Sequence, residues 1–197
     1  MLIESNGCVL PGQYNYRHIY SAHIKQSPLG AFCFYLVLLK WLNMFQKRKN
    51  YFWLVVIIIS IAAFFRLYKL DSTPPGLYPD EAMNGNNAIQ ALETGDFKVF
   101  YPENNGREGL FINIQAISIY LLGENVVALR IVSAFFGILT VLGLYFLTRE
   151  LFNREIALIA SFLMAVGFWH VHFSRIGFRA IMAPFFLVWM LYFFWRG

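Results

Sequence analysis

The sequence is poor in charged residues. Asp, Glu, Lys and Arg together make up 14% of its 197 residues, whereas about a quarter of the residues of a soluble domain are charged. Hydrophobic residues account for 58% of the chain and aromatic residues for 19%. This composition excludes an ordinary soluble domain and indicates an integral membrane protein.

Cysteine is scarce as well, and the basic residues do not gather in one region. Cys8 and Cys33 both precede the first long apolar segment, and their pattern predicts neither a disulfide nor a metal site.

The formal net charge is +5, but the basic residues are scattered between apolar segments. This scatter excludes a nucleic-acid-binding face. We expect these residues to contact anionic lipid head groups or lipid phosphates.

Charge is absent altogether from residues 51–65, and the apolar character continues to Leu70. The segment therefore has the roughly 20 residues that are needed to cross a hydrocarbon core. Three later segments qualify in the same way. The predicted spans are about 51–70, 126–148, 156–174 and 180–195. We therefore predict an all-α fold, a polytopic transmembrane helical bundle.

The chain changes in composition near its N-terminus. Residues 1–46 are a poorly defined N-terminal extension without a sustained hydrophobic period, whereas residues 47–197 contain the apolar segments. Because the change falls near Met44, we expect this methionine to be the natural start of translation. We also expect the native chain to continue past Gly197.

A run of basic residues at 47–49 immediately precedes the first predicted span. The positive-inside rule places this end in the cytoplasm, so that the outer loop, residues 71–125, faces the extracytoplasmic side. Arg130, Arg175 and Arg179 then fall on or near the outer side, against the rule. We interpret them as arginines that are held there for a purpose.

An acidic pair, Asp80 and Glu81, stands near the start of the outer loop, after a Pro- and Gly-containing turn at 73–76. Acidic residues suit the N-terminus of a helix, where unpaired N–H groups carry partial positive charge. We predict helices at 82–93 and 110–122 that lie along the membrane interface, because the first is too polar and the second too short to span. Carboxylates near a membrane cost desolvation energy, which favours an enzyme with its site at this boundary.

Four short motifs follow one another along the chain. They are Pro79-Asp80-Glu81-Ala82, Gly95-Asp96-Phe97, Gly106-Arg107-Glu108-Gly109-Leu110 and Leu129-Arg130-Ile131-Val132-Ser133-Ala134. Their order and spacing resemble the GT-C membrane glycosyltransferases, in the branch of the protein mannosyltransferases and the aminoarabinose transferases of lipid A. Residues 173–179 are similar to a further element of bacterial and archaeal members. The resemblance covers about residues 50–197 and implies the N-terminal part of a GT-C fold.

The resemblance implies transfer of a sugar from a polyprenyl-phosphate carrier to a protein or glycolipid acceptor outside a bacterial or archaeal plasma membrane. In this family an Asp at the start of the first outer loop is the catalytic base, and it corresponds to Asp80, with Glu81 as its helper. The chemistry agrees, because an acceptor hydroxyl is a poor nucleophile until a carboxylate takes its proton.

The resemblance also implies a set of residues near the carrier phosphate: Arg107, Glu108, Arg175 and Arg179. At the first two positions the local turn differs from that of relatives, because Gly109 stands where they carry proline. A surface ion pair is the alternative for Arg107 and Glu108. Arg175 and Arg179 would share a face on a continuous helix, and anchoring to lipid head groups is their alternative role.

No cofactor is identified by the sequence, and a divalent cation is compatible with it but not required. His170 and His172 lie two residues apart without a Cys or acidic partner nearby, so we predict no metal site there. Two other functions stay open: an oligosaccharyltransferase-like enzyme, and a non-catalytic membrane protein such as a transporter fragment. A transporter is expected to show acidic residues or broken helices near the bilayer midplane. The alternative role for Asp80 and Glu81 is purely structural: the pair caps a helix.

Overall fold

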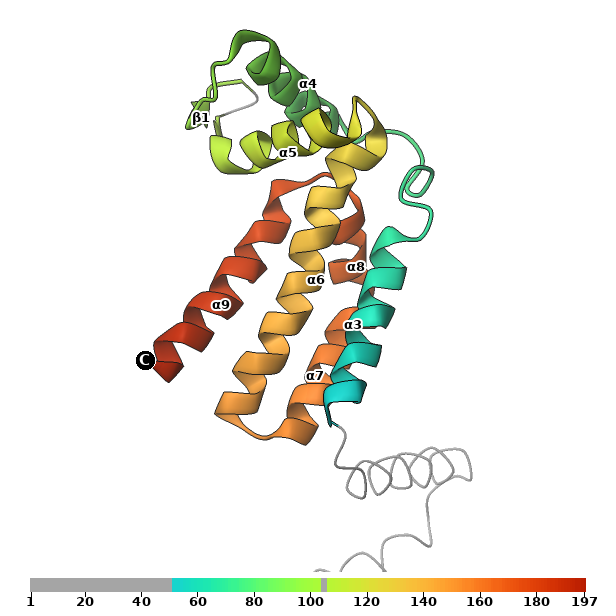
Figure 1. Cartoon of the computed structure of the whole chain (residues 1–197), viewed down its shortest axis with the longest axis vertical. Helices are drawn as coiled ribbons and strands as arrows, with labels where there is room; N and C mark the ends of the chain where they lie inside the picture. The colour runs from blue at the N-terminus through green and yellow to red at the C-terminus, as the bar shows by residue number, and fades with distance from the viewer. Residues whose placement is uncertain (1–50, 104–105) are drawn as a thin grey trace, which may run out of the picture. The chain divides into compact units, whose positions relative to one another are not determined.

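The structure is a computed structural model that describes residues 51–103 and 106–197 (Figure 1). Within these ranges it has seven α-helices, one short 3-10 helix and one two-stranded antiparallel hairpin. The predicted all-α class is confirmed. The N-terminal extension, with Met44 and both cysteines, lies outside the described residues.

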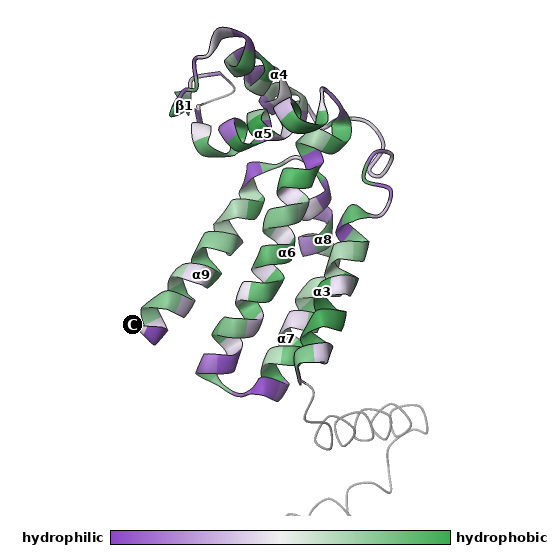
Figure 2. Ribbon diagram, in the orientation of Figure 1, coloured by the Kyte–Doolittle hydropathy of each residue, from purple (hydrophilic) through white to green (hydrophobic). Residues whose placement is uncertain are grey.

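Helix α6 (Val126–Leu151) is the centre of the bundle. It contacts α3 (Tyr51–Leu67), α7 (Arg154–Val166), α8 (Phe168–Arg175) and α9 (Met182–Arg196). Figure 2 shows that these helices are hydrophobic along most of their length, with hydrophilic residues at the turn between α6 and α7. The bundle is therefore built from the apolar segments that the sequence contains.

Among the described residues, α6 is the one single helix that is long and apolar enough to cross a membrane, with 26 residues. Helices α7 and α8 pass the same test as a pair, although they are bent by 54° at the break between them. The predicted span 156–174 is thus a broken helix. The predicted spans 51–70 and 180–195 correspond to helices of 17 and 15 residues.

A buried arginine of α3 holds the break between α7 and α8. Gly167 takes an extended backbone (φ −62°, ψ 122°) and ends α7. The fully buried Arg66 donates hydrogen bonds to the carbonyl oxygens of Ala165 at 3.0 Å and Met164 at 3.3 Å. Its guanidinium also contacts Nδ1 of His170 at 2.7 Å. Because carbonyls at a helix end lack helical donors, Arg66 acts as the cap of α7.

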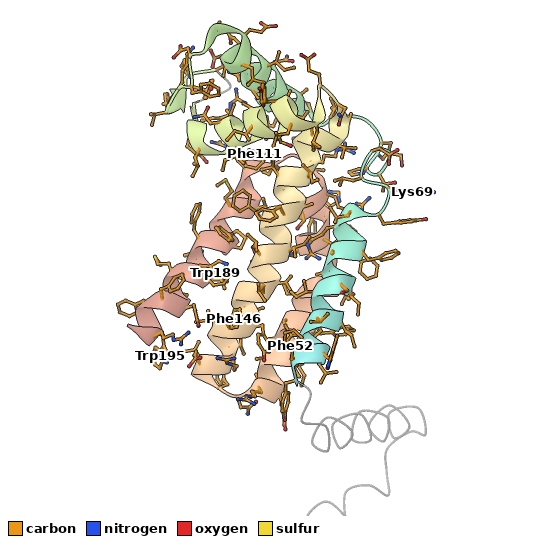
Figure 3. All side chains as sticks on the ribbon, viewed as in Figure 1. Phe52, Lys69, Phe111, Phe146, Trp189 and Trp195 are labelled. Carbon is orange, nitrogen blue, oxygen red and sulfur yellow. The ribbon has the colours of Figure 1, made fainter. Side chains whose placement is uncertain are left out.

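Two glycines of α6 allow neighbouring helices to approach closely. A Cβ on Gly137 would overlap the hydroxyl of Ser174 on α8, and a Cβ on Gly143 would lie 2.9 Å from Nε1 of Trp189 on α9. Small residues at helix contacts are typical of membrane bundles. Figure 3 shows Trp189 and Phe146 between α6 and α9, where their ring centroids are 6.1 Å apart.

Helices α4 (Pro79–Thr94) and α5 (Gly109–Leu122) form a second layer with the hairpin of β1 (Phe100–Tyr101) and β2 (Arg107–Glu108) (Figure 1). The layer covers one end of the bundle, where α5 packs against α4 and α6. Its core consists of Ala88, Tyr101, Ile112, Ala116, Ile119, Ala128 and Leu129. The two helices predicted in the outer loop are therefore confirmed as helices; their position at a membrane interface stays a prediction.

Candidate active site

The acidic pair lies in the first turn of α4. Pro79 is the first helical residue, which suits its fixed φ and its missing N–H. Glu81 occupies the third helical position, and its carboxylate accepts a hydrogen bond from the N–H of Tyr78 at 3.3 Å. This bond is one half of a capping box, and it fixes where the helix begins.

Glu81 is a buried carboxylate, with 1% of its surface exposed. It forms an ion pair with Arg130 of α6, whose Nε lies 2.8 Å from Oε1 and whose Nη2 lies 3.3 Å from Oε2. Oε1 also accepts a hydrogen bond from the N–H of Gly177 at 3.1 Å. Together with the N–H of Tyr78, three groups in different parts of the chain donate to this carboxylate. A buried charge needs such partners, because burial removes it from water.

Arg130 also fixes the loop between α3 and α4. Its guanidinium donates hydrogen bonds to the carbonyl oxygens of Leu70 at 3.1 Å, Pro74 at 2.9 Å and Gly76. One buried side chain therefore connects α6, the loop and the start of α4. This role gives Arg130 a structural reason to lie at this end of α6. Sequence reasoning singled out Arg130, both as an arginine expected on the outer side and as part of a motif, but did not identify Glu81 as its partner.

Gly177, between α8 and the 3-10 helix η2 (Arg179–Ile181), presses its backbone against α4. Its carbonyl oxygen accepts a hydrogen bond from Nδ2 of Asn84 at 3.3 Å. A Cβ at this position would lie 3.0 Å from Cγ of Glu81 and 3.1 Å from Nε2 of Gln115. Any larger residue would push on both side chains, and Gly177 is a second contributor to the site that sequence reasoning missed.

Asp80 has a different environment from Glu81. Its side chain is half-buried rather than fully buried. Adjacent helical residues point about 100° apart around the axis. The two acids of the motif are thereby separated: Glu81 is bonded into the core, and Asp80 keeps access to solvent at the start of α4.

Arg107 is not part of a surface ion pair. It is 2% exposed, and its guanidinium donates hydrogen bonds to Oδ1 of Asn84 and, at 3.1 Å, to Oδ1 of Asn87. It also contacts the carbonyl oxygen of Glu103 at 3.4 Å. The alternative that paired Arg107 with Glu108 on the surface is therefore wrong for the described residues. The observed role of Arg107 is to attach the hairpin to α4.

Glu108 pairs instead with Arg179, and this ion pair is exposed. The side chain of Glu108 is 68% accessible and that of Arg179 is 32% accessible. The next residue, Gly109, donates its N–H to the carbonyl oxygen of Val99 at 2.7 Å. Proline has no N–H and could not make this bond. The observed turn therefore depends on a residue other than proline at position 109.

Arg175 is bonded to the end of α3. Its guanidinium donates to four backbone carbonyls, those of Phe65, Tyr68, Lys69 and Thr73, at 2.6 to 3.1 Å. Helix α8 ends at Arg175, and extended backbone at Ile176 separates it from Arg179. The two arginines are therefore not on one continuous helix and do not share a helix face.

A cavity of about 420 Å³ opens beside the Glu81–Arg130 pair. It is lined by the loop residues Pro74 to Pro79, by Glu81 and Arg130, and by Trp169, His172, Phe173, Ile176 and Phe178. Trp169 stacks on Phe173 at 6.3 Å between ring centroids. The cavity thus has one aromatic wall from α8 and one polar wall from the ion pair. Asp80 lies between Pro79 and Glu81, which both line it.

The two histidines lie in different surroundings. His170 faces Arg66 inside the bundle, whereas His172 lines the cavity and stacks on Phe168 at 5.7 Å. Among residues 51–103 and 106–197, no group of three or more His, Cys, Asp or Glu is placed to hold a metal ion.

Comparison with known families gives a match to the C-terminal part of the chain. Residues 110–197 match the family model described as dolichyl-phosphate-mannose-protein mannosyltransferase. The matched segment begins within α5 and includes Arg130, Arg175 and Arg179, whereas Asp80 and Glu81 precede it. No curated protein and no solved structure matches the chain significantly.

Proposed function

Because residues 110–197 form a domain of the dolichyl-phosphate-mannose-protein mannosyltransferase family, in the GT-C superfamily, we propose that the chain is part of a multi-pass membrane glycosyltransferase. The family itself implies an integral membrane enzyme that depends on a lipid-phosphate sugar. The donor is a sugar on polyprenyl phosphate, and the acceptor is a protein or glycolipid on the extracytoplasmic side of a bacterial or archaeal plasma membrane.

Asp80 is the general base in this proposal. The main support comes from Glu81, the other acid of the motif. Its carboxylate is bonded to Arg130, Tyr78 and Gly177 and has a structural role. Asp80 is the acid of the motif that is accessible from solvent. Its carboxylate accepts the proton of the acceptor hydroxyl while the oxygen attacks the anomeric carbon. The bond from that carbon to the phosphate oxygen breaks, and polyprenyl phosphate leaves with the electron pair.

Arg179 is the residue that we propose for the carrier phosphate. Its partner Glu108 is exposed, and an exposed ion pair is worth so little that a phosphate can replace it. Phe178, beside Arg179, lines the cavity, so the aromatic wall and this cation lie next to each other. An isoprenoid phosphate combines the same two chemistries. Arg107, Glu108 and Arg175 support this region by holding the hairpin, Arg179 and the end of α3.

The broken helix bears on the transporter alternative. Discontinuous helices in transporters leave backbone carbonyls that coordinate the transported ion. Here the carbonyls of Met164 and Ala165 at the break already accept hydrogen bonds from Arg66. The break therefore supports a structural role for this region and favours the enzyme.

Asp80→Asn tests the proposal in the native full-length enzyme. The amide keeps the shape of the carboxylate but cannot take the proton. We expect turnover to fall by about 10²–10⁴-fold, the usual contribution of a general base. The assay measures sugar released from a polyprenyl-phosphate donor in the presence of acceptor.

Asp71→Asn is the matched control, because Asp71 is an exposed acid of the same outer loop. We expect this variant to keep normal turnover. Near-normal turnover of Asp80→Asn would instead limit Asp80 to a favourable charge in the first turn of α4 and place the catalytic base elsewhere.

A further inference from the structure

A second cavity lies at the other end of the bundle from α4, near the turn between α6 and α7. Its volume is about 540 Å³. We call it the basal groove, and it is lined by Tyr51, Phe52, Val55, Val56, Ile59, Ser60, Leu142, Tyr145, Phe146, Arg149 and Arg154. Figure 3 labels Phe52 and Phe146 in this part of the molecule. The groove is remote from the Glu81–Arg130 pair, so the proposed reaction does not use it.

The walls of the basal groove are apolar and follow α3 for more than two helical turns. The stretch from Tyr51 to Ser60 is about 14 Å long at the rise of an α-helix. Val55 and Ile59 of α3 and Leu142 and Phe146 of α6 all line the groove. A groove of this length and chemistry at the surface of a membrane bundle suits an acyl chain, because that chain would bury only apolar groups.

Two arginines stand at the charged end of the groove. The guanidinium of Arg149 lies 5.6 Å from the ring centroid of Phe146, and that of Arg154 lies 5.5 Å from the ring centroid of Tyr51. Both rings line the groove. These cation–π contacts hold the two charges beside the apolar walls instead of leaving them free in solvent.

The acidic groups nearby do not neutralise both arginines. Arg149 pairs with the exposed Glu150 at 3.1 Å, and surface pairs of this kind contribute little. Within residues 51–103 and 106–197, Arg154 forms no ion pair. The sequence adds Lys47, Arg48 and Lys49 directly before α3. Basic residues on one side of a membrane attract anionic lipid head groups.

We propose that the basal groove binds one anionic phospholipid, with an acyl chain against Val55 and Ile59 and the phosphate between Arg149 and Arg154. Guanidinium groups bind phosphate oxygens through charge-assisted hydrogen bonds, often two at a time. The lipid would contact α3, α6 and α7 together. It would therefore stabilise the packing of α3 at the end that lies farthest from Arg66.

The experiment uses the full chain in mixed micelles that contain phosphatidylcholine alone or with phosphatidylglycerol. Native mass spectrometry counts the retained lipid, and thermal unfolding reports its effect on stability. We expect selective retention of phosphatidylglycerol and a rise in Tm that phosphatidylcholine does not produce. Arg149→Gln with Arg154→Gln removes the charge, and we expect it to weaken retention by roughly ten- to hundredfold, as the loss of charge-assisted hydrogen bonds predicts.

Arg196→Gln is the matched control. Arg196 also lies over an aromatic ring, 5.8 Å from the centroid of Tyr192, but it belongs to α9 and does not line the groove. Ile59→Trp is a second test, because it fills the apolar wall without changing charge. The Tm of each variant in phosphatidylcholine alone shows whether it folds.

Three results would overturn the proposal. Equal retention of the two lipids would remove its headgroup selectivity. Unchanged retention in the double variant or in Ile59→Trp would place the lipid elsewhere. Full displacement of phosphatidylglycerol by inorganic phosphate would show that the site binds phosphate alone and that the acyl chain does not contribute to binding.

Discussion

The carboxylate of Glu81 and the guanidinium of Arg130 form one bonded unit in the core of the molecule. Both side chains are 1% exposed, and the arginine also donates to backbone carbonyls of the loop before α4. Removing one member of a buried ion pair leaves the other charge without compensation. The pair therefore fixes the position of Asp80 indirectly, because it holds the first turn of α4 against α6.

Arg130→Ala tests this role by its effect on stability. We expect the free energy of unfolding to fall by about 3–5 kcal/mol, the usual cost of breaking a buried pair. Thermal and denaturant unfolding in detergent measure the change. Glu81→Gln removes the charge but keeps one of the two acceptor oxygens, so it should cost less than Arg130→Ala.

The exposed pair of Arg179 and Glu108 supplies the control for that prediction. Arg179→Ala should change stability by about 1 kcal/mol or less, since surface ion pairs contribute little. If Arg130→Ala and Arg179→Ala lowered the free energy of unfolding equally, burial would not be the reason why the Glu81–Arg130 pair stabilises the protein.

At the scale of helices, α6 and α8 are in contact because Gly137 has no side chain. A Cβ there would overlap Ser174, which is fully buried and donates a hydrogen bond to the carbonyl oxygen of His170. Gly137→Ala should therefore destabilise the protein by about 1–3 kcal/mol, the typical cost of overpacking. Thermal unfolding in detergent measures the loss.

Ala183→Val is the comparison for Gly137→Ala. Ala183 is exposed on α9, so the added methyl groups have room. We expect little change in Tm for this variant. A stable Gly137→Ala variant would mean that α8 can move away from α6 without cost.

The sequence predicted the helices but not their breaks and contacts. Hydropathy placed apolar segments near the observed α3, α6 and α9, because uncharged runs are visible in one dimension. The break at Gly167 was not predicted, since one glycine in an apolar run does not by itself end a helix. The pairing of Glu81 with Arg130 joins residues 49 positions apart, and a single sequence has no local signal for it. Asp80 and Glu81 were correctly placed at a helix start.

On the scale of the whole described molecule, α6 links the two ends that carry charge. Arg130 lies near its start and Arg149 near its end, with no charged residue between them. At 1.5 Å per residue the two Cα atoms are about 29 Å apart along the axis. This length is close to the hydrocarbon thickness of a bilayer, about 30 Å. We expect the two arginines to mark the two faces of the membrane.

This placement predicts the sidedness of the chain. In a background with Cys8→Ser and Cys33→Ser, single cysteines at Ser72 and Phe152 report the two ends, because both positions are exposed in the structure. From the basic residues at 47–49, the positive-inside rule predicts that the N-terminal end of α3 lies in the cytoplasm, so Ser72 should face outward. A membrane-impermeant maleimide should label Ser72→Cys in intact cells, whereas Phe152→Cys should react only after permeabilisation. The reverse pattern would put Asp80 and the neighbouring cavity in the cytoplasm, and transfer to an extracytoplasmic acceptor would then be impossible.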